Sequence, residues 1–509
     1  MKEREKIDLK NLGGEKEKKM RNEKRVKFGK RKALLFVALF AVLVSLSIET
    51  ASAATLYVHP GESIQDAIDA ASSSDTIEVY SGTYYENVNV TKQLVLRGVD
   101  TGEGKPIVDA SGNGSAIILC ADGIVLEGFE VTNSTGWLGA GIRIMSENNI
   151  VRDINATNSD YGIILYFSSN NTLKDNLMSG NGYNFGVWGA NDNDIDTSNL
   201  VDGKPIYYLV GASDRVIDSS SNAGTVYCVG CDNITVTGLT LTKNSDGVVF
   251  HNTCNSRIEN NQISSNLFGI GLYKSTNNTV IDNKASNNGE GIKLYKSSNN
   301  TVIDNKASNI NGTGIWIWLS MNNTITGNNA SNNSVGIKLV FSSNNTITGN
   351  IANDNKFYGI LIAESSDNTI TGNTVSYNTY GIYPVYPSSR KTYNPYTGET
   401  NFSNNEHNGI DLSNSGNNKI YLNNFMNNLE NVHPEISGNF WNSTEPLTYQ
   451  YKNTTFTSYM GNFWSDYKGL DADGDGRGDT PYVIDSDEDR HPLMSRFENY
   501  SDICAMVWH

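Results

Sequence analysis

Histidine and cysteine are scarce in this sequence, which has 6 histidines and 5 cysteines among 509 residues. The internal histidines stand singly, and no His-rich or Met-rich tract accompanies them: His59, His251, His407, His433 and His491. Imidazole and thioether side chains are typical copper ligands. The sequence therefore gives no sign of a copper-handling tract, and no histidine cluster indicates a catalytic centre.

Positive charge is also in deficit, because 39 Lys and Arg face 55 Asp and Glu and the formal net charge is −16. Residues 1–53 are the exception, with 14 basic and 7 acidic residues, so the rest of the chain carries −23. Such acidity argues against nucleic acid and anionic membranes as partners.

Long apolar runs are missing except for one near the N-terminus. Ala33 to Ile48 follows a basic region and leads to Ala51-Ser52-Ala53. This order is typical of a secretory signal peptide, and the run is too short for a stable membrane span. We expect residues 1–53 to be a signal peptide with a long charged leader, and the mature chain to be secreted or on the cell surface. An uncleaved leader is the alternative, and would be the only link to a membrane.

The middle of the chain is a repeat. A Gly-Ile pair recurs at intervals of 22 or 23 residues, at Gly269, Gly291, Gly314, Gly336, Gly359 and Gly381. Between these pairs an Asn-Asn-Thr motif, or Asp-Asn-Thr in the last case, recurs with its threonine at Thr279, Thr301, Thr324, Thr346 and Thr369. A fixed period in the twenties is typical of stacked units that contact only their neighbours.

Each unit consists of short runs of alternating apolar and polar residues separated by Asn, Ser and Gly, as in strands and tight turns. Aliphatic residues recur in columns, for example Ile292, Ile315, Ile337, Ile360 and Ile382. Such columns suit a parallel β-helix, whose strands lie about 4.8 Å apart along the axis. Stacked asparagines can hydrogen-bond along a column and also tolerate left-handed turns. We predict an all-β fold, a right-handed parallel β-helix.

Both ends of the β-helix need caps, because open ends expose the core and unpaired strand edges. An amphipathic helix with Ser63 as its N-cap is expected to plug the N-terminal end. Together with Gly82-Thr83-Tyr84-Tyr85-Glu86-Asn87, it resembles the opening of pectate-lyase-like solenoids. We interpret Glu86 as structural and not catalytic.

The spacing of the repeat breaks twice. The first break favours an insertion near 196–224, and the second favours a protruding loop at 387–400. We expect the β-helix to cover 54–437 and an aromatic C-terminal cap to cover 438–509.

Three sequence features stand out: Asp202-Gly203-Lys204-Pro205-Ile206-Tyr207-Tyr208, the Asn-Asn-Thr-Ile coils, and Gly461-Asn462-Phe463-Trp464-Ser465-Asp466-Tyr467. Together they resemble the NosD-type β-helix family, especially its archaeal cell-surface members, over about residues 55–495. The resemblance implies the fold but does not decide the activity. That family shares its coil pattern with carbohydrate-binding and sugar-hydrolase modules, and its namesake is a periplasmic accessory protein for copper-enzyme maturation.

An acidic loop in the cap has the spacing of a calcium site. Carboxylates stand at loop positions 1, 3, 5 and 9, and glycine stands at position 6: Asp471, Asp473, Asp475, Asp479 and Gly476. Calcium takes six to eight oxygen ligands, and Arg477 would add its carbonyl. Position 12 is Tyr482, so Asp485 or Asp487 is expected to complete the shell. We expect a structural calcium ion; a solvated acidic turn is the alternative.

The cysteines are Cys120, Cys228, Cys231, Cys254 and Cys504. The repeat register places Cys228 inward, and Cys231 and Cys254 in neighbouring turns about one coil apart. This spacing suits a disulfide between Cys231 and Cys254 in an oxidising compartment. Buried thiols are an alternative, and a copper or zinc site that includes His251 is another.

Outward positions of the Gly-Ile strands form one continuous face with aromatic and cationic residues: Tyr273, Lys293, Tyr295, Trp316, Trp318 and Lys338. Aromatic planes at coil spacing suit the ring faces of a polysaccharide, and lysines suit its carboxylates. Stacking that merely stabilises the sheet is the alternative.

No catalytic residue is assigned, because these coils lack the pair of carboxylates about 5–10 Å apart that glycoside hydrolysis requires. The favoured hypothesis is a non-catalytic surface protein that binds or organises polysaccharide of the cell envelope. A lyase, hydrolase or epimerase acting on an acidic glycan is the second hypothesis, and NosD-like copper-enzyme maturation is the third.

Overall fold

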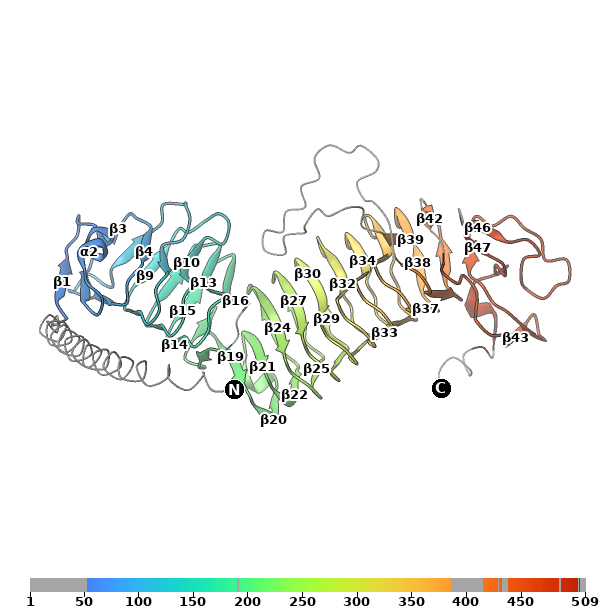
Figure 1. Ribbon diagram of the computed structural model, residues 1–509, viewed down its shortest axis with the longest axis horizontal. Helices are drawn as coiled ribbons and strands as arrows, with labels where there is room; N and C mark the ends of the chain where they lie inside the picture. Colours follow the sequence, from blue (N-terminus) through green and yellow to red (C-terminus); the bar gives the residue numbers. More distant parts are fainter. Residues whose placement is uncertain are drawn as a thin grey trace, which may run out of the picture. The chain divides into compact units, whose positions relative to one another are not determined.

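A computed structural model describes residues 53–189, 192–385, 415–428, 430–432, 438–484, 487–501 and 503. Strands stack in successive parallel coils (Figure 1), so the predicted β-helix is confirmed. Residues 1–52 of the expected signal peptide, and the loop expected at 387–400, lie outside the described residues. Among the described residues there is no helix whose length and apolar character would let it span a membrane.

The N-terminal coils, residues 55–201, build three sheets. The first sheet contains β1 (Thr55–Val58), β2 (Thr76–Tyr80), β5 (Val95–Val99), β8 (Val125–Glu127), β11 (Ile150–Arg152), β14 (Thr172–Lys174) and β17 (Asp194–Ile195). The second sheet contains β4 (Val88–Val90), β7 (Ile117–Leu119), β10 (Ala140–Ile144), β13 (Tyr161–Tyr166) and β16 (Tyr183–Trp188). The third sheet begins with β3 (Thr83–Tyr84), β6 (Ile107–Asp109), β9 (Glu130–Thr132), β12 (Asn155–Thr157), β15 (Leu177–Ser179) and β18 (Leu200–Val201).

The third sheet continues into the central coils, residues 204–432. Its further strands are β19 (Lys204–Val210), β21 (Thr225–Val229), β24 (Asp246–His251), β27 (Phe268–Tyr273), β30 (Glu290–Tyr295), β32 (Thr313–Trp318), β34 (Val335–Val340), β36 (Tyr358–Ala363), β39 (Tyr380–Val385) and β42 (Glu430–Val432). A fourth sheet contains β20 (Ser213–Ile217), β22 (Asp232–Thr237), β25 (Arg257–Glu259), β28 (Thr279–Ile281), β31 (Thr301–Ile303), β33 (Thr324–Thr326), β35 (Thr346–Thr348), β37 (Thr369–Thr371) and β40 (Lys419–Tyr421). Short sheets pair β23 (Thr240–Thr242), β26 (Gln262–Ser264) and β29 (Lys284–Ala285), and β38 (Thr374–Ser376), β41 (Asn424–Met426) and β45 (Phe463–Trp464).

The predicted columns are present in register. Ile292 pairs with Ile315, which pairs with Ile337, and all three are fully buried. Beside them, buried asparagine amides donate from coil to coil, as Asn278 Nδ2 does to Asn300 Oδ1 at 3.1 Å. The left-handed turn belongs to the preceding residue, since Asn277 has φ 57°. One asparagine of each pair therefore forms the amide ladder and its neighbour forms the left-handed turn, whereas the sequence argument had assigned both roles to a single asparagine.

The hairpin from β18 to β19 changes which side of the third sheet faces a core. These two strands pair antiparallel, and Asp202 and Gly203 between them both have positive φ, as a two-residue hairpin requires. On β21, Val226 and Cys228 then enter the core of the central coils, whereas Tyr227 and Val229 enter the N-terminal core. The region near 196–224, where an insertion was expected, is therefore a junction built of coil strands.

Both ends carry caps. In α2 (Ile64–Ala70), the Ser63 hydroxyl accepts from the Asp66 N–H at 3.1 Å, as predicted for the N-cap. Glu86 accepts from the backbone N–H groups of Ile64 and Gln65, which is a structural role. The C-terminal cap contains β43 (Leu447–Tyr451), β44 (Thr454–Ser458), β46 (Tyr482–Ile484) and β47 (Asp487–Asp489), with the short 3-10 helices η1 (Ser219–Ser221) in the junction and η2 (Phe497–Asn499) in the cap.

Candidate functional site

The six residues proposed for glycan contact lie on the outward side of the third sheet. Two columns hold them: Tyr273, Tyr295 and Trp318 stack in successive coils, and Lys293, Trp316 and Lys338 stack in the neighbouring column. All six are half-buried. This is the same side of the sheet on which Tyr227 closes the N-terminal core, so the face begins where that core ends.

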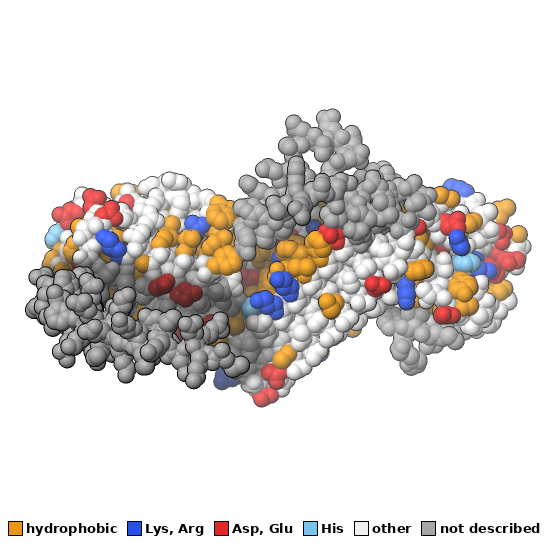
Figure 2. All heavy atoms as spheres, viewed as in Figure 1, with side chains coloured by type: hydrophobic (Ala, Val, Ile, Leu, Met, Phe, Trp, Pro, Cys, Tyr) orange, Lys and Arg blue, Asp and Glu red, His pale blue; other side chains and the backbone are white. Residues whose placement is uncertain are grey.

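Ring contacts join the two columns into one surface, which we call the aromatic–lysine face. The Trp316 and Trp318 rings are nearly parallel, 5.2 Å apart, and Tyr295 packs against Trp318 at 4.8 Å. Lys293 Nζ lies 4.3 Å and Lys338 Nζ 5.1 Å from the centre of the Trp316 ring. Figure 2 shows hydrophobic side chains gathered over the middle coils with lysine or arginine side chains beside them.

Neither lysine forms an ion pair with a carboxylate among the described residues. Burial lowers the pKa of Lys293 to about 8, although attraction to Glu290 and Asp246 opposes the shift. Burial also lowers the pKa of Lys338. The Trp316 indole N–H is buried and finds no acceptor in the described part of the chain. The face thus holds two lysines without an ion pair and an indole N–H without an acceptor among the described residues.

Two carboxylates that the sequence argument missed stand at the edge of this face. Asp246 and Glu290 occupy the same column, two coils apart, with Phe268 between them. Asp246 is buried and accepts from the Tyr227 hydroxyl at 3.1 Å. Glu290 accepts from the Thr313 N–H at 2.6 Å.

Burial raises the pKa of Asp246 to about 6, with opposing hydrogen bonds from Ser245 and Tyr227. Burial also raises the pKa of Glu290. A signal for both residues was present in the sequence, because each directly precedes the glycine of a Gly-Ile or Gly-Val strand. The sequence argument placed only Asn, Ser, Lys and aromatic residues on this face and did not include these two carboxylates.

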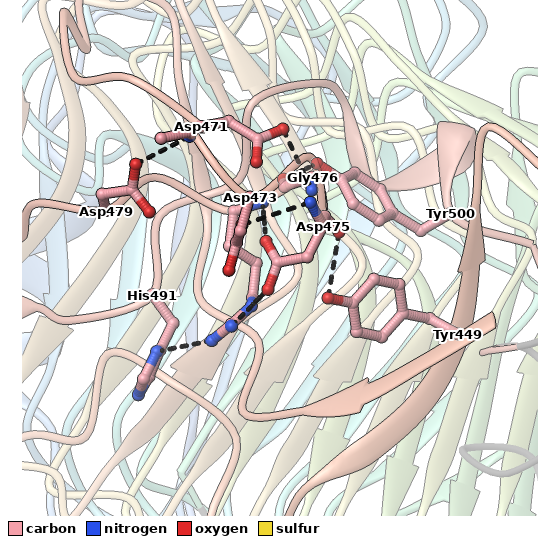
Figure 3. Close-up of polar contacts among 10 residues, drawn as sticks. Tyr449, Asp471, Asp473, Asp475, Gly476, Asp479, His491 and Tyr500 are labelled. Atoms are coloured by element: carbon pink, nitrogen blue, oxygen red, sulfur yellow. Dashed lines mark hydrogen bonds and ion pairs between the residues drawn. The ribbon is translucent and has the colours of Figure 1, made fainter. Parts of the chain in front are cut away.

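The acidic loop of the cap brings three of its carboxylates together (Figure 3). One oxygen each from Asp471, Asp473 and Asp475 lies within 4.8 Å of the others. Asp471 Oδ2 accepts from the Gly476 N–H, whereas its Oδ1 is buried and has no partner among the described residues. Tyr449 and Tyr500 hold the loop by donating to the carbonyls of Asp475 and Gly476.

Other members of the predicted calcium set have different partners. Asp479 accepts from the Ala472 N–H at 2.7 Å, and the Arg477 side chain binds Asp475 as well as His491. Asp487, one of the two residues expected to complete the shell, accepts from the Trp441 indole N–H at 3.1 Å and is not part of the three-carboxylate group. Asp485 lies outside the described residues.

Comparison with protein families gives two matches. A model described as periplasmic copper-binding protein (NosD) matches residues 68–208 and 308–469, which is more than half of the chain. The chain belongs to the NosD family. A model of the right-handed β-helix region matches residues 187–330 and 224–375, which confirms the predicted handedness. The Asp202-Gly203 hairpin, one of the features that resembled NosD, is the element that inverts the third sheet.

The similar solved structures have low identity to this chain. The A-module of Azotobacter vinelandii mannuronan C-5 epimerase AlgE4 is 15% identical, with a TM-score of 0.36, covering 74% of this chain and 94% of that one. A lacto-N-biosidase from Eubacterium ramulus is 14% identical, with a TM-score of 0.30, covering 76% and 66%. A comparison with curated proteins finds no match.

The copper implied by the NosD description does not fit the described residues. Their only cluster of three or more potential ligands from His, Cys, Asp and Glu is the Asp471, Asp473 and Asp475 group, whose hard oxygens suit calcium or magnesium. The Cys228 and Cys231 side chains are both buried, and the Cys231 thiol donates to the backbone carbonyls of Leu209 and Val229. His251 stacks outward with Tyr273, on the other side of the sheet from Cys228.

The predicted disulfide between Cys231 and Cys254 is wrong for this structure, where both thiols are free. Cys254 pairs with Asp232 and not with Cys231, and its thiol lies 3.2 Å from the Asp232 carboxylate. A one-residue offset in a strand reverses the direction of the side chain. Cys231 therefore points inward to Cys228, whose hydrogen bond lowers the pKa of Cys231 to about 7. Cys120 is exposed and free, and Cys504 lies outside the described residues.

Proposed function

We propose that this protein binds an acidic polysaccharide on the aromatic–lysine face. The observation that carries the proposal is the pair of amines on the Trp316 ring, Lys293 at 4.3 Å and Lys338 at 5.1 Å, neither paired with a described carboxylate. A buried or half-buried cation is costly without a counter-ion. A carboxylate or sulfate of a sugar chain supplies that counter-ion, and charge-assisted hydrogen bonds make the pairing strong.

The spacing of the face suits a chain of sugars better than a single small molecule. Tyr295 and Trp318 lie one coil apart, and Lys293 and Lys338 lie two coils apart along the same axis. Coils repeat every 4.8 Å or so. A polymer laid along the axis would therefore meet rings and amines in turn, and its apolar ring faces would cover the aromatic side chains.

We further propose that the chain works outside the cytoplasm, in the cell envelope, as the signal-peptide pattern in residues 1–53 suggests. The family description as periplasmic supports export. Envelope polysaccharide is the partner of matching chemistry in that compartment. The acidity of the chain outside residues 1–53 repels anionic polymers in general, so binding of an acidic polysaccharide must be confined to the lysines of the aromatic–lysine face.

Binding is tested with the full chain, polygalacturonate and a neutral dextran by isothermal titration calorimetry. We expect polygalacturonate to bind, more weakly as salt rises, and dextran not to bind. Lys338→Met should weaken polygalacturonate binding several-fold. Lys306→Met is the matched control, because Lys306 is exposed and lies outside the face. Equal affinity for both polymers, or equal loss in both variants, would contradict the proposal.

We propose, separately, that Asp471, Asp473 and Asp475 hold a structural calcium ion, with the Asp479 carboxylate and the Arg477 carbonyl nearby. The unpartnered Asp471 oxygen supports this assignment. Calcium chelation should lower the melting temperature of the cap and expose it to protease, and added calcium should restore both. Asp473→Asn should abolish the effect of chelation, whereas Asp354→Asn in a central coil should preserve it. An identical melting temperature of the unmodified chain with and without chelator would contradict the calcium assignment.

A further inference from the structure

The edge of the aromatic–lysine face gathers titratable groups from three successive coils. Asp246 lies on β24, Tyr273 on β27, and Glu290 and Lys293 on β30. Asp246 and Glu290 share one column, and the Tyr273 ring folds back over Gly271, where a Cβ would clash with it. Gly271 occupies the position of Lys293 in the preceding coil, so its missing side chain leaves room for the tyrosine ring beside the lysine.

Lys293 is held by rings and not by a counter-ion. Its Nζ lies 4.3 Å from the centre of Trp316, 5.1 Å from Phe268 and 5.4 Å from Trp318. The titratable groups around it are Glu290 on its own strand, Asp246 on β24, Tyr273 on β27 and Lys338 on β34. An amine enclosed by apolar rings gives up its proton more readily than a solvated one, which is the usual way to make a lysine a general base.

The two neighbouring groups offer complementary roles. Lys338 contacts the same Trp316 ring as Lys293, so a sugar carboxylate bound to Lys338 would bring its adjacent C–H group toward Lys293. Glu290 is fixed by the Thr313 N–H at one oxygen, and its buried carboxyl is biased toward the protonated form. Asp246 is too buried to touch a ligand and acts as a positioning residue through its charge.

We propose that Lys293, with Lys338 and Glu290, forms an acid–base centre that removes the C5 proton of a uronate residue in the bound polysaccharide. This inference rests on the proposed glycan binding. The C5–H bond breaks, the proton moves to Lys293 Nζ, and the electron pair enters the enolate of the uronate carboxyl group. Lys338 and the Glu290 carboxyl group stabilise the added charge. Return of a proton to C5 completes a redox-neutral exchange.

The test uses the full chain with polymannuronate, polyguluronate and polygalacturonate in D₂O, and NMR detects deuterium at C5. We expect exchange in at least one polymer, with a rate that rises as pH passes through about 8 because the Lys293 amine becomes neutral. A deuterated product with retained configuration would indicate exchange alone. Inverted configuration at C5 would indicate epimerisation, and unsaturated chain ends would indicate elimination.

Lys293→Arg keeps a cation but removes the base, so exchange should fall at least about a hundredfold while affinity stays within a few-fold. Glu290→Gln should reduce exchange at all pH values without removing the rise near pH 8. Lys306→Arg is the control. Polymers that bind without C5 exchange, or exchange that persists in Lys293→Arg, would overturn the acid–base centre and leave the binding proposal standing. Failure of all three polymers to bind would overturn both.

Discussion

Aromatic side chains gather on two sheets of this molecule, and their surroundings differ. On the second sheet, Tyr161 packs against Tyr183 at 5.3 Å and against Trp188 at 6.4 Å. These rings cover buried apolar residues that point outward from the strands, Ala140 and Ile164. On the aromatic–lysine face the matching positions carry Lys293, Trp316 and Lys338.

The comparison teaches that aromatic content alone does not identify a binding surface. Rings over Ile164 continue the core outward and contact each other. This cluster also holds one cation, Arg143, which lies 5.5 Å from the Trp137 ring and whose Nε has no partner among the described residues. Rings over lysines leave cations and an indole N–H without partners from the described chain. The polar groups beside the rings, and not the rings, indicate a ligand.

The largest effect is expected from Trp188→Ala on the second sheet. Trp188 packs against Tyr161 and Tyr166, and its indole donates to Ser245 at 2.9 Å across the junction. Truncation should lower the free energy of unfolding by roughly 2–4 kcal/mol. Glycan affinity should be unchanged, as measured by calorimetry on the folded variant. A loss of affinity with unchanged stability would erase the distinction between the two clusters.

The reverse pattern is expected from Trp318→Ala on the aromatic–lysine face. Trp318 contacts Tyr295 and Trp316, and Lys293 Nζ lies 5.4 Å from its ring. Affinity for polygalacturonate should fall about tenfold, equivalent to about 1.4 kcal/mol. The melting temperature should fall less than in Trp188→Ala. Unchanged affinity would remove Trp318 from the site.

The smallest expected effect is a pH dependence of the glycan affinity that comes from the aromatic–lysine face alone. Burial lowers the pKa of Lys293 to about 8, so its cation is present below that pH and is lost above it. Affinity for polygalacturonate should therefore fall a few-fold between about pH 7 and 9. Lys293→Arg should bind with little change over this range, because arginine stays charged. A pH dependence that is equal in both proteins would assign it to another group.

Much of the fold could be predicted because the central coils repeat. In each column of isoleucine or asparagine, the same residue type recurs at the same position of several coils. Such repeated agreement between local sequence and fold does not arise by chance. The junction was harder. Asp202 and Gly203 form a recognisable hairpin turn, but that turn inverts the sheet only because the strands on either side belong to different cores.

The site was predicted in part for a related reason. Lys293 and Trp316 lie inside the repeating motif, so their common face followed from the register. Asp246 and Glu290 each precede the glycine of a Gly-Ile or Gly-Val strand, two coils apart, at a position whose residue type varies from coil to coil, so the repeat did not draw attention to them. The disulfide prediction failed because Cys254 pairs with Asp232, one residue away from Cys231. The sequence does not reveal this offset, since the flanking coils lack the Asn-Asn-Thr motif.

The asparagine ladder has a consequence for how such a chain can change length. Its amides connect Asn368 directly to Asn418, fifty positions later, with the same 3.0 Å contact found between ordinary coils. Any segment may leave the column and return without disturbing its neighbours, provided that it re-enters with an asparagine in place. Duplication or loss of one whole coil would shift the cap along the axis and preserve the contacts between the remaining coils, so the length of the β-helix can change in steps of one coil.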